Sequence, residues 1–378
     1  MFPCICGQPA GRNKYPEAES LSRAGPDSHD SNKVDYSALD DGFGATYERM
    51  AFSEIIKGYA ERFGAHKMLE LNATYIAGVP GFNSCILAQD GYDVTVMVHG
   101  RDYQETLRAW ELAGLSDRVK IVEWNDDLAT PFANGEFDMV WNHLVFEHYS
   151  DPAPLVREMT RVSNNLIMNL TLSPTNIGFP MHWAYHKITK ARWDHGSVRN
   201  MRISTMKRTH KEAGLTPVGW GGCDAPPWID TVDLQLGGSM QYVGHAVGSK
   251  RWVWAATNPA ARRHPLIRRT WGWERLLPDW YRSLVAHHLY VISTKESSPG
   301  YRNGTTAKHS FEKKTLLESA AGWLSIPLQI AVVAGTTMVL AASTAAIVLR
   351  GTSRSAPAPG FKPRSIFPPT TSEGSEDD

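Results

Sequence analysis

Short β-branched apolar runs alternate with helix-like stretches between Lys67 and Leu172, and this alternation constrains the fold more than any other feature of the chain. Most runs are continuously apolar, which is typical of strands in a parallel sheet that helices cover on both faces. The helical stretches between them indicate βαβ units, whose ligands bind beyond the carboxyl ends of the strands. Function is therefore expected in the residues that follow each run. The runs occupy residues 67–71, 93–98, 119–124, 137–141 and 166–172.

Two late strands, near residues 216–220 and 288–293, complete the predicted fold. It is an α/β, Rossmann-like sheet of seven mostly parallel strands, with helices on both faces and a separate C-terminal transmembrane helix. Helices are expected where apolar residues recur with helical spacing and glycine or a capping residue marks an end. They span residues 45–63, 83–89 and 102–112, a stretch beginning at 151–152, and a stretch from Ser204 or Thr205 to Ala213.

These elements define one large domain over residues 44–296, with a cap or insert region at about 174–285. Residues 1–43 and 350–378 are rich in Ser, Pro and acidic residues, so both are predicted to be disordered. Residues 297–319 are expected to be a linker. Residues 1–42 also lack the apolar stretch of a signal peptide, which favours a cytosolic domain.

The overall charge and the cysteines exclude several classes of function. Formal net charge is zero, so no nucleic-acid partner is expected. Four cysteines do not make a disulfide framework in 378 residues. The Cys4-x-Cys6 pair lacks the second pair that a zinc site needs.

Glycines and carboxylates follow the first and third predicted strands. Gly78 and Gly81 lie in the first turn, where glycine lets the backbone approach a ligand and a helix N-terminus favours negative groups. Asp126 and Asp127 follow the third strand, where a carboxylate can accept a hydrogen bond from an adenine amino group. The alternatives are an ordinary glycine-containing loop and a solvated acidic loop.

Together these segments, in this order, resemble the class I S-adenosylmethionine-dependent methyltransferases of the small-molecule, type 11-like subgroup. The likeness covers roughly residues 45–295 and is strongest from 125 to 162. It implies S-adenosylmethionine as cofactor and a small or lipid-like methyl acceptor. The segments are the Leu-Glu-Leu strand 69–71, the glycine-containing turn, Asp126…Pro131-Phe132…Phe137-Asp138, Glu147-His148…Asp151-Pro152, and Glu158-Met159-x-Arg161-Val162.

The resemblance also implies roles for individual residues. Asp126, with Asp127, would face adenine, and Asn142 would lie beneath the sulfonium, so that Asn142→Ala weakens cofactor binding without unfolding the chain. The residues placed around the methionine part of the cofactor are Glu70, Asn72, Gly78 and Gly81.

Two features depart from the family pattern. Asn72-Ala73-Thr74 stands where closely spaced glycines are usual, and the second strand ends in Val98-His99 rather than in an acidic residue. His99, or Asp102 reaching back, is then expected to hold the ribose hydroxyls. These departures leave open a catalytically inactive binding protein of the same fold. A dinucleotide-dependent oxidoreductase is disfavoured, because it expects a Gly-x-Gly-x-x-Gly turn and an acidic residue after the second strand.

Three histidines are candidates for a general base, which methyl transfer requires only for a hydroxyl or similarly poor nucleophile. They are His143, His148 and His182, and none is assigned as catalytic; capping or packing is the alternative for His148. His182-x-x-x-His186 has the one-turn spacing of a metal pair, but no third ligand is evident nearby, so no metal is predicted. A wall of the acceptor pocket, with Trp183 and Tyr185, is the other interpretation.

No charged residue occurs between Glu318 and Arg350. Residues 320–349 are long enough to span a bilayer as a helix, with 330–349 the best segment; a buried soluble helix is the alternative. A single-pass membrane protein with its catalytic domain in the cytoplasm is therefore expected. Upstream, arginines interleave with aromatic residues between Arg262 and Arg282. This pattern indicates either a surface that contacts anionic lipid headgroups or a cap subdomain whose tryptophans form its core.

Overall fold

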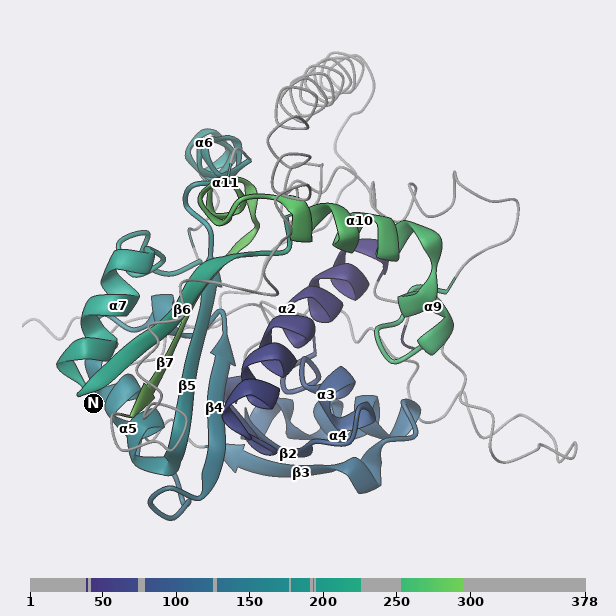
Figure 1. Cartoon of the computed structure of the whole chain (residues 1–378), viewed down its shortest axis with the longest axis vertical. Coiled ribbons are helices and arrows are strands. Elements are labelled where there is room, and N and C mark those ends of the chain that lie inside the picture. The colour runs from purple at the N-terminus through teal and green to yellow at the C-terminus, as the bar shows by residue number, and fades with distance from the viewer. Residues whose placement is uncertain are drawn as a thin grey trace, which may run out of the picture.

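A single seven-stranded sheet organises the chain in a computed structural model (Figure 1). The structure describes residues 39, 42–73, 79–124, 128–176, 178–190, 193, 195–225 and 253–295. The strand order is β3-β2-β1-β4-β5-β7-β6. Strands β1 to β5 are parallel, and β7 runs antiparallel to both β5 and β6, so the predicted mostly parallel sheet is confirmed. The bounds are β1 Lys67–Ala73, β2 Asp93–His99, β3 Val119–Trp124, β4 Phe137–His143, β5 Ser163–Leu172, β6 Leu215–Cys223 and β7 His288–Lys295.

Helices cover both faces of this sheet. On one face, α2 (Gly42–Phe63), α3 (Cys85–Gln89) and α4 (Tyr103–Leu112) contribute to one hydrophobic cluster, joined by α9 (Pro259–Arg263) and α10 (Pro265–Leu276). On the other face, α5 (Ala153–Val162) and α7 (Ile203–Glu212) form a second cluster with the sheet. Two further helices are α6 (Phe179–Thr189) and α11 (Asp279–Val285).

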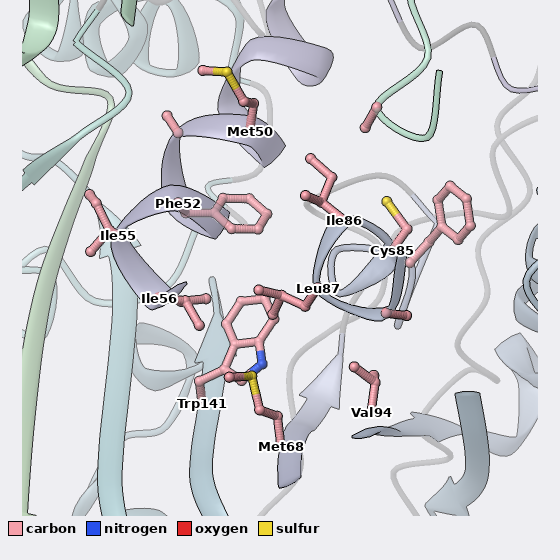
Figure 2. Packing of buried hydrophobic residues seen from close by; sticks show 14 of the residues in the cluster. Met50, Phe52, Ile55, Ile56, Met68, Cys85, Ile86, Leu87, Val94 and Trp141 are labelled. Atoms are coloured by element: carbon pink, nitrogen blue, oxygen red, sulfur yellow. The ribbon is translucent and has the colours of Figure 1, made fainter. Parts of the chain in front are cut away.

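Trp141 of β4 lies at the centre of the first cluster, among side chains of α2, α3 and β1 (Figure 2). Its ring centroid lies 5.6 Å from that of Phe52, and both side chains are fully buried. Ile56 of α2 and Leu87 of α3 belong to the same cluster. Each large apolar side chain buried in this way stabilises the fold by about 1.5–3 kcal/mol. The long N-terminal helix is therefore part of the domain core.

Side-chain alternation along β4 decides which helix layer each residue faces. Val140 packs in the cluster with α5, whereas Trp141 packs in the cluster with α2. Because successive strand residues point to opposite faces, Asn142 continues on the α5 side and His143 on the α2 side. Their contacts agree: Asn142 reaches Met159 of α5, and the His143 ring packs at a tilt against Phe52 of α2, with ring centroids 5.2 Å apart.

Three details differ from the sequence prediction. The first described helix begins at Gly42 instead of Ala45. Helix α7 begins at Ile203, after Arg202, whose side chain makes no capping hydrogen bond. The Thr205 hydroxyl instead donates to the Arg199 carbonyl, so the expected helix start at Ser204 or Thr205 is wrong. Strand β6 and helix α7 fall inside the predicted cap region, yet both belong to the sheet and its helix layer.

The predicted transmembrane segment 320–349, the linker 297–319 and the C-terminal tail all lie outside the described residues. So does the predicted N-terminal disordered segment, apart from Leu39, Gly42 and Phe43. No described helix combines the length and the apolar character that crossing a membrane requires.

Candidate cofactor site

Glu70 lies near the carboxyl end of β1 and is only 1% exposed. Its carboxylate accepts hydrogen bonds from the Ser84 backbone N–H at 3.1 Å, the Ser84 hydroxyl at 2.6 Å and the Asn83 amide at 3.4 Å. Burial raises the pKa of Glu70 to about 7, although these donors favour the charged form. The side chain therefore holds the start of α3 against β1. Its direct contact with a cofactor stays a prediction.

Gly81 lies in the turn between β1 and α3 with a φ of +69°, a conformation that favours glycine. A Cβ there would lie 2.7 Å from Cγ1 of Val98, so the turn also packs too closely on β2 for a side chain. The Trp110 indole N–H donates to the Gly81 carbonyl at 3.1 Å, and the Thr106 hydroxyl donates to the Pro80 carbonyl at 2.9 Å. These contacts fix the turn against both β2 and α4.

Asp102 ends the short 3₁₀ helix η3 (Gly100–Asp102) that follows β2. Its side chain is buried, and within the described parts of the chain its Oδ1 accepts no hydrogen bond; Nε of Arg101 lies 3.4 Å away. Burial raises the pKa of Asp102, which reflects the cost of an ionised carboxylate there. The His99 Nδ1 accepts the Arg101 N–H at 3.2 Å, and its ring packs edge-on against Trp124. A carboxylate oxygen in need of a donor thus lies after β2.

The segment after β3 is tied to α5 by Arg161 and Glu158. The Arg161 guanidinium donates to the carbonyls of Phe132 at 2.8 Å and Thr130 at 3.2 Å. Glu158 accepts the Thr130 N–H at 2.8 Å and pairs with Arg161 at 2.7 Å. The Glu158…Arg161 pair of the sequence motif therefore contacts the segment that contains the Pro131-Phe132 pair. These contacts hold the chain just beyond the predicted adenine loop.

Asn142 is fully buried at the end of β4, inside a polar network on the α5 and α7 side. Its Oδ1 accepts a hydrogen bond from the Asn169 amide at 2.7 Å, and its Nδ2 lies 3.5 Å from Sδ of Met159. The network continues from Asn169 Oδ1 to His210 Nε2 at 2.6 Å and from His210 Nδ1 to Ser293 Oγ at 2.8 Å. Because buried hydrogen-bond partners are costly to remove, Asn142→Ala should also lower the stability of the fold. That the variant still folds stays a prediction. Contact with a sulfonium stays a prediction.

Glu147 of the Glu147-His148 pair braces the end of β5. Its Oε1 accepts the Leu172 N–H at 3.0 Å, and burial raises its pKa to about 8. The Gly196 backbone packs so closely that a Cβ would lie 2.5 Å from the Glu147 carbonyl oxygen. This acidic residue of the motif therefore has structural contacts.

Of the three histidine candidates, His143 is the one that the structure describes most fully. Its Nε2 lies 3.3 Å from Oε1 of Glu48, and its ring centroid lies 4.6 Å from that of His288. Burial lowers the pKa of His143 to about 3, which makes it a poor general base at neutral pH. His148 is half-buried at the end of a 3₁₀ turn, where its backbone N–H donates to the Val145 carbonyl.

Several predicted site residues lie outside what the structure describes. Gly78, Asp126 and Asp127 are not among the described residues, and the side chains of Asn72 and His182 are likewise not described. The structure thus brings the Gly81 turn and Asp102 together around α4, and it places Asn142 on the other face of the sheet from His143. Sequence reasoning missed Glu48 and His288, because nothing local marks a helix residue and a late strand residue as neighbours.

Comparison with known proteins gives one sequence match. Residues 76–165 match a family model described as "Methyltransferase domain". No curated protein sequence is similar to this chain.

Similar solved structures are distant. Magnesium protoporphyrin IX methyltransferase from Synechocystis PCC 6803, solved with S-adenosylhomocysteine, is 11% identical, with a TM-score of 0.38 and 70% of this chain and 88% of that chain covered. The YcgJ protein of Bacillus subtilis is 13% identical, with a TM-score of 0.38 and coverages of 64% and 97%. The [4+2]-cyclase SpnF is 15% identical, with a TM-score of 0.38 and coverages of 64% and 80%. Likenesses this distant assign no reaction to the chain.

The matched segment runs from the turn after β1 into the start of β5, and it includes the Arg161 and Glu158 contacts that explain the sequence motif. The match agrees with the predicted resemblance: residues 76–165 are similar to a methyltransferase domain.

Proposed function

We propose that the chain binds S-adenosylmethionine at the carboxyl ends of β1, β2 and β3 and transfers its methyl group to a small or lipid-like acceptor. The match to a methyltransferase domain over residues 76–165 is the observation that carries this proposal. The bound cofactor would supply an electrophilic methyl group on its sulfonium. The protein then has to position donor and acceptor in line and to exclude water.

Asp102 supports the fit of an adenosyl group at this edge of the sheet. Its buried Oδ1 has Arg101 Nε at 3.4 Å but makes no hydrogen bond of acceptable geometry among the described residues, and it lies next to the α4 helix that anchors the Gly81 turn. A ribose hydroxyl would supply the missing donor. Such a bond to a charged acceptor is worth about 1.5–3 kcal/mol. Asp102 therefore takes the place of the acidic residue that the second strand lacks.

Calorimetric titration of the full chain with S-adenosylhomocysteine tests the proposal. We expect saturable binding of one ligand per chain, weakened about 10- to 100-fold by Asp102→Asn, because the lost bond is charge-assisted. The apo stability of this variant should stay equal or rise, since no buried charge is left unpaired. Asp117→Asn, at a well-exposed position after α4, is the matched control and should bind like the wild type. Absence of binding by the wild-type chain would reject the proposal.

A catalytically inactive binding protein of the same fold is the second candidate. Glu70 is engaged by α3, Asn142 by Asn169, and the Gly81 turn by Trp110, so these residues also have purely structural partners. Methyl transfer from labelled cofactor to a lipid extract separates the two candidates, provided that the chain binds the cofactor. Binding without transfer to any acceptor tested would favour the inactive protein.

Membrane attachment through residues 320–349, with the domain in the cytoplasm, is part of the same proposal. The arginine- and aromatic-rich stretch supports it in part, because Arg263, Arg268, Arg269 and Trp280 are exposed. Arg282, in contrast, is buried and pairs with Asp279 at 2.7 Å, as expected for a structural cap. Flotation of the full chain and of a chain without residues 320–349 on liposomes tests the anchor. Equal flotation of both would remove it.

A further inference from the structure

Three side chains from distant parts of the sequence converge at the carboxyl edge of the sheet, on the α2 side. They are Glu48 of α2, His143 at the end of β4 and His288 at the start of β7. One ligand atom from each lies within 4.8 Å of the other two. The Glu48 Oε1 lies 3.3 Å from His143 Nε2 and 3.7 Å from His288 Nε2.

Hydrogen bonding within the described residues does not account for this arrangement. His143 is 2% exposed and His288 is 5% exposed, and both ring nitrogens of His143 lack a hydrogen bond of acceptable geometry. Nδ1 of His288 lacks one as well. A buried polar atom without a partner costs about 1–3 kcal/mol. Two buried imidazoles that meet edge to face beside a carboxylate thus need a further partner.

An imidazole ring in its neutral form presents a nitrogen lone pair, and this is the form that binds metal. The nearby charges include two carboxylates, since Asp224 Oδ2 lies 3.9 Å from His288 Nδ1. The opposing charge is Arg49, a buried cation that donates to Asn83.

We propose that Glu48, His143 and His288 bind a divalent transition-metal ion. Two imidazole nitrogens and one carboxylate oxygen form a ligand set that suits zinc and iron(II). Ligands about 2.1 Å from a tetrahedral ion lie about 3.4 Å apart, close to the two distances that involve Glu48. Asp224 Oδ2 lies 3.9 Å from the other ring nitrogen of His288, Nδ1, and is hydrogen-bonded to Nδ1 of His287 at 2.9 Å. The sequence predicted no metal, because the three ligands share no local motif.

Cobalt(II) titration of the chelator-treated full chain tests this site, followed by visible absorption and with zinc(II) as competitor. We expect one ion per chain. Glu48→Gln, His143→Gln and His288→Gln should each weaken binding by at least about 100-fold, the upper end of what the loss of an outer-shell group costs. His210→Gln is the control for loss of a buried histidine, because His210 lies on the opposite face, and it should keep full affinity.

X-ray absorption of the zinc-loaded wild-type chain keeps the test decisive if a variant does not fold. The expected spectrum contains nitrogen and oxygen neighbours at about 2.0–2.2 Å, including two imidazoles. A sulfur neighbour at about 2.3 Å would assign the ion to the cysteines and overturn the proposal. Failure of the wild-type chain to bind cobalt, or equal binding by all variants, would also overturn it. None of these results depends on cofactor binding, so they are independent of the proposed methyl transfer.

Discussion

Replacing Glu147 by glutamine should remove a large pH dependence from the stability of the folded chain. The carboxyl has an ordinary pKa of 4.5, and burial raises it to about 8 in the folded state. Between these values the folded state keeps a proton that the unfolded state has released, so wild-type stability falls as pH rises through this window. Each pH unit well inside the window costs about 1.4 kcal/mol, so the loss from pH 5 to pH 7 is about 2–3 kcal/mol.

Glutamine preserves the acceptor for the Leu172 N–H but cannot ionise. The glutamine side-chain nitrogen replaces Oε2 of Glu147, which has no hydrogen-bond partner among the described residues. Any loss of stability from this exchange is therefore the same at every pH. Urea denaturation of both full chains at pH 5, 6 and 7 measures the effect. The free energy of unfolding of Glu147→Gln relative to the wild type should rise by about 2–3 kcal/mol over this range.

The other buried groups cancel in that difference, including Glu70, whose pKa burial raises to about 7. Glu111→Gln, at an exposed position on α4, is the control and should follow the wild type at each pH. A difference between wild type and Glu147→Gln that stays constant from pH 5 to pH 7 would refute the reasoning. It would mean that Glu147 is solvated or charged in the folded state.

Further predictions concern single side chains around the site, each checked by chemical denaturation. Gly81→Ala should destabilise the chain by about 2–4 kcal/mol, because it adds left-handed backbone strain and a clash with β2. Gly64 has a similar φ but no atom near its Cβ position, so Gly64→Ala should cost only the backbone strain, about 1–2 kcal/mol. Asn142→Ala should cost about 1–3 kcal/mol, because it removes the buried oxygen that accepts a hydrogen bond from the Asn169 amide. Asn164→Ala removes only an exposed bond and should cost less than about 0.5 kcal/mol. Arg161→Ala should cost about 1–2 kcal/mol and increase proteolytic cleavage after β3, and unchanged cleavage would contradict its bracing role.

The strands were predictable because local sequence determines them. Each continuous apolar run predicted a strand to within about three residues, and the run at 119–124 coincides with β3. Glycines at helix ends were equally informative, since Gly64, Gly91 and Gly114 all have positive φ. Periodicity and turn chemistry act over a few residues, so the sequence alone reveals them.

The partners of the site residues were not predictable, because they depend on long-range packing. Nothing local shows that Glu70 binds the start of α3, or that Asn142 joins a network with His210. The side to which Asn142 and His143 point follows only once the register of β4 against both helix layers is known. The meeting of Glu48 with His288 is the extreme case, since nearly the whole domain separates them in sequence.

A crystal structure of the full chain with S-adenosylhomocysteine tests the central claim most directly. We predict the ligand at the carboxyl ends of β1, β2 and β3, with its ribose hydroxyls at about 2.5–3.0 Å from the carboxylate of Asp102, the usual range for hydroxyl donors. A ligand bound elsewhere, or an Asp102 carboxylate without a ligand donor, would contradict the assignment of this edge of the sheet as the cofactor site.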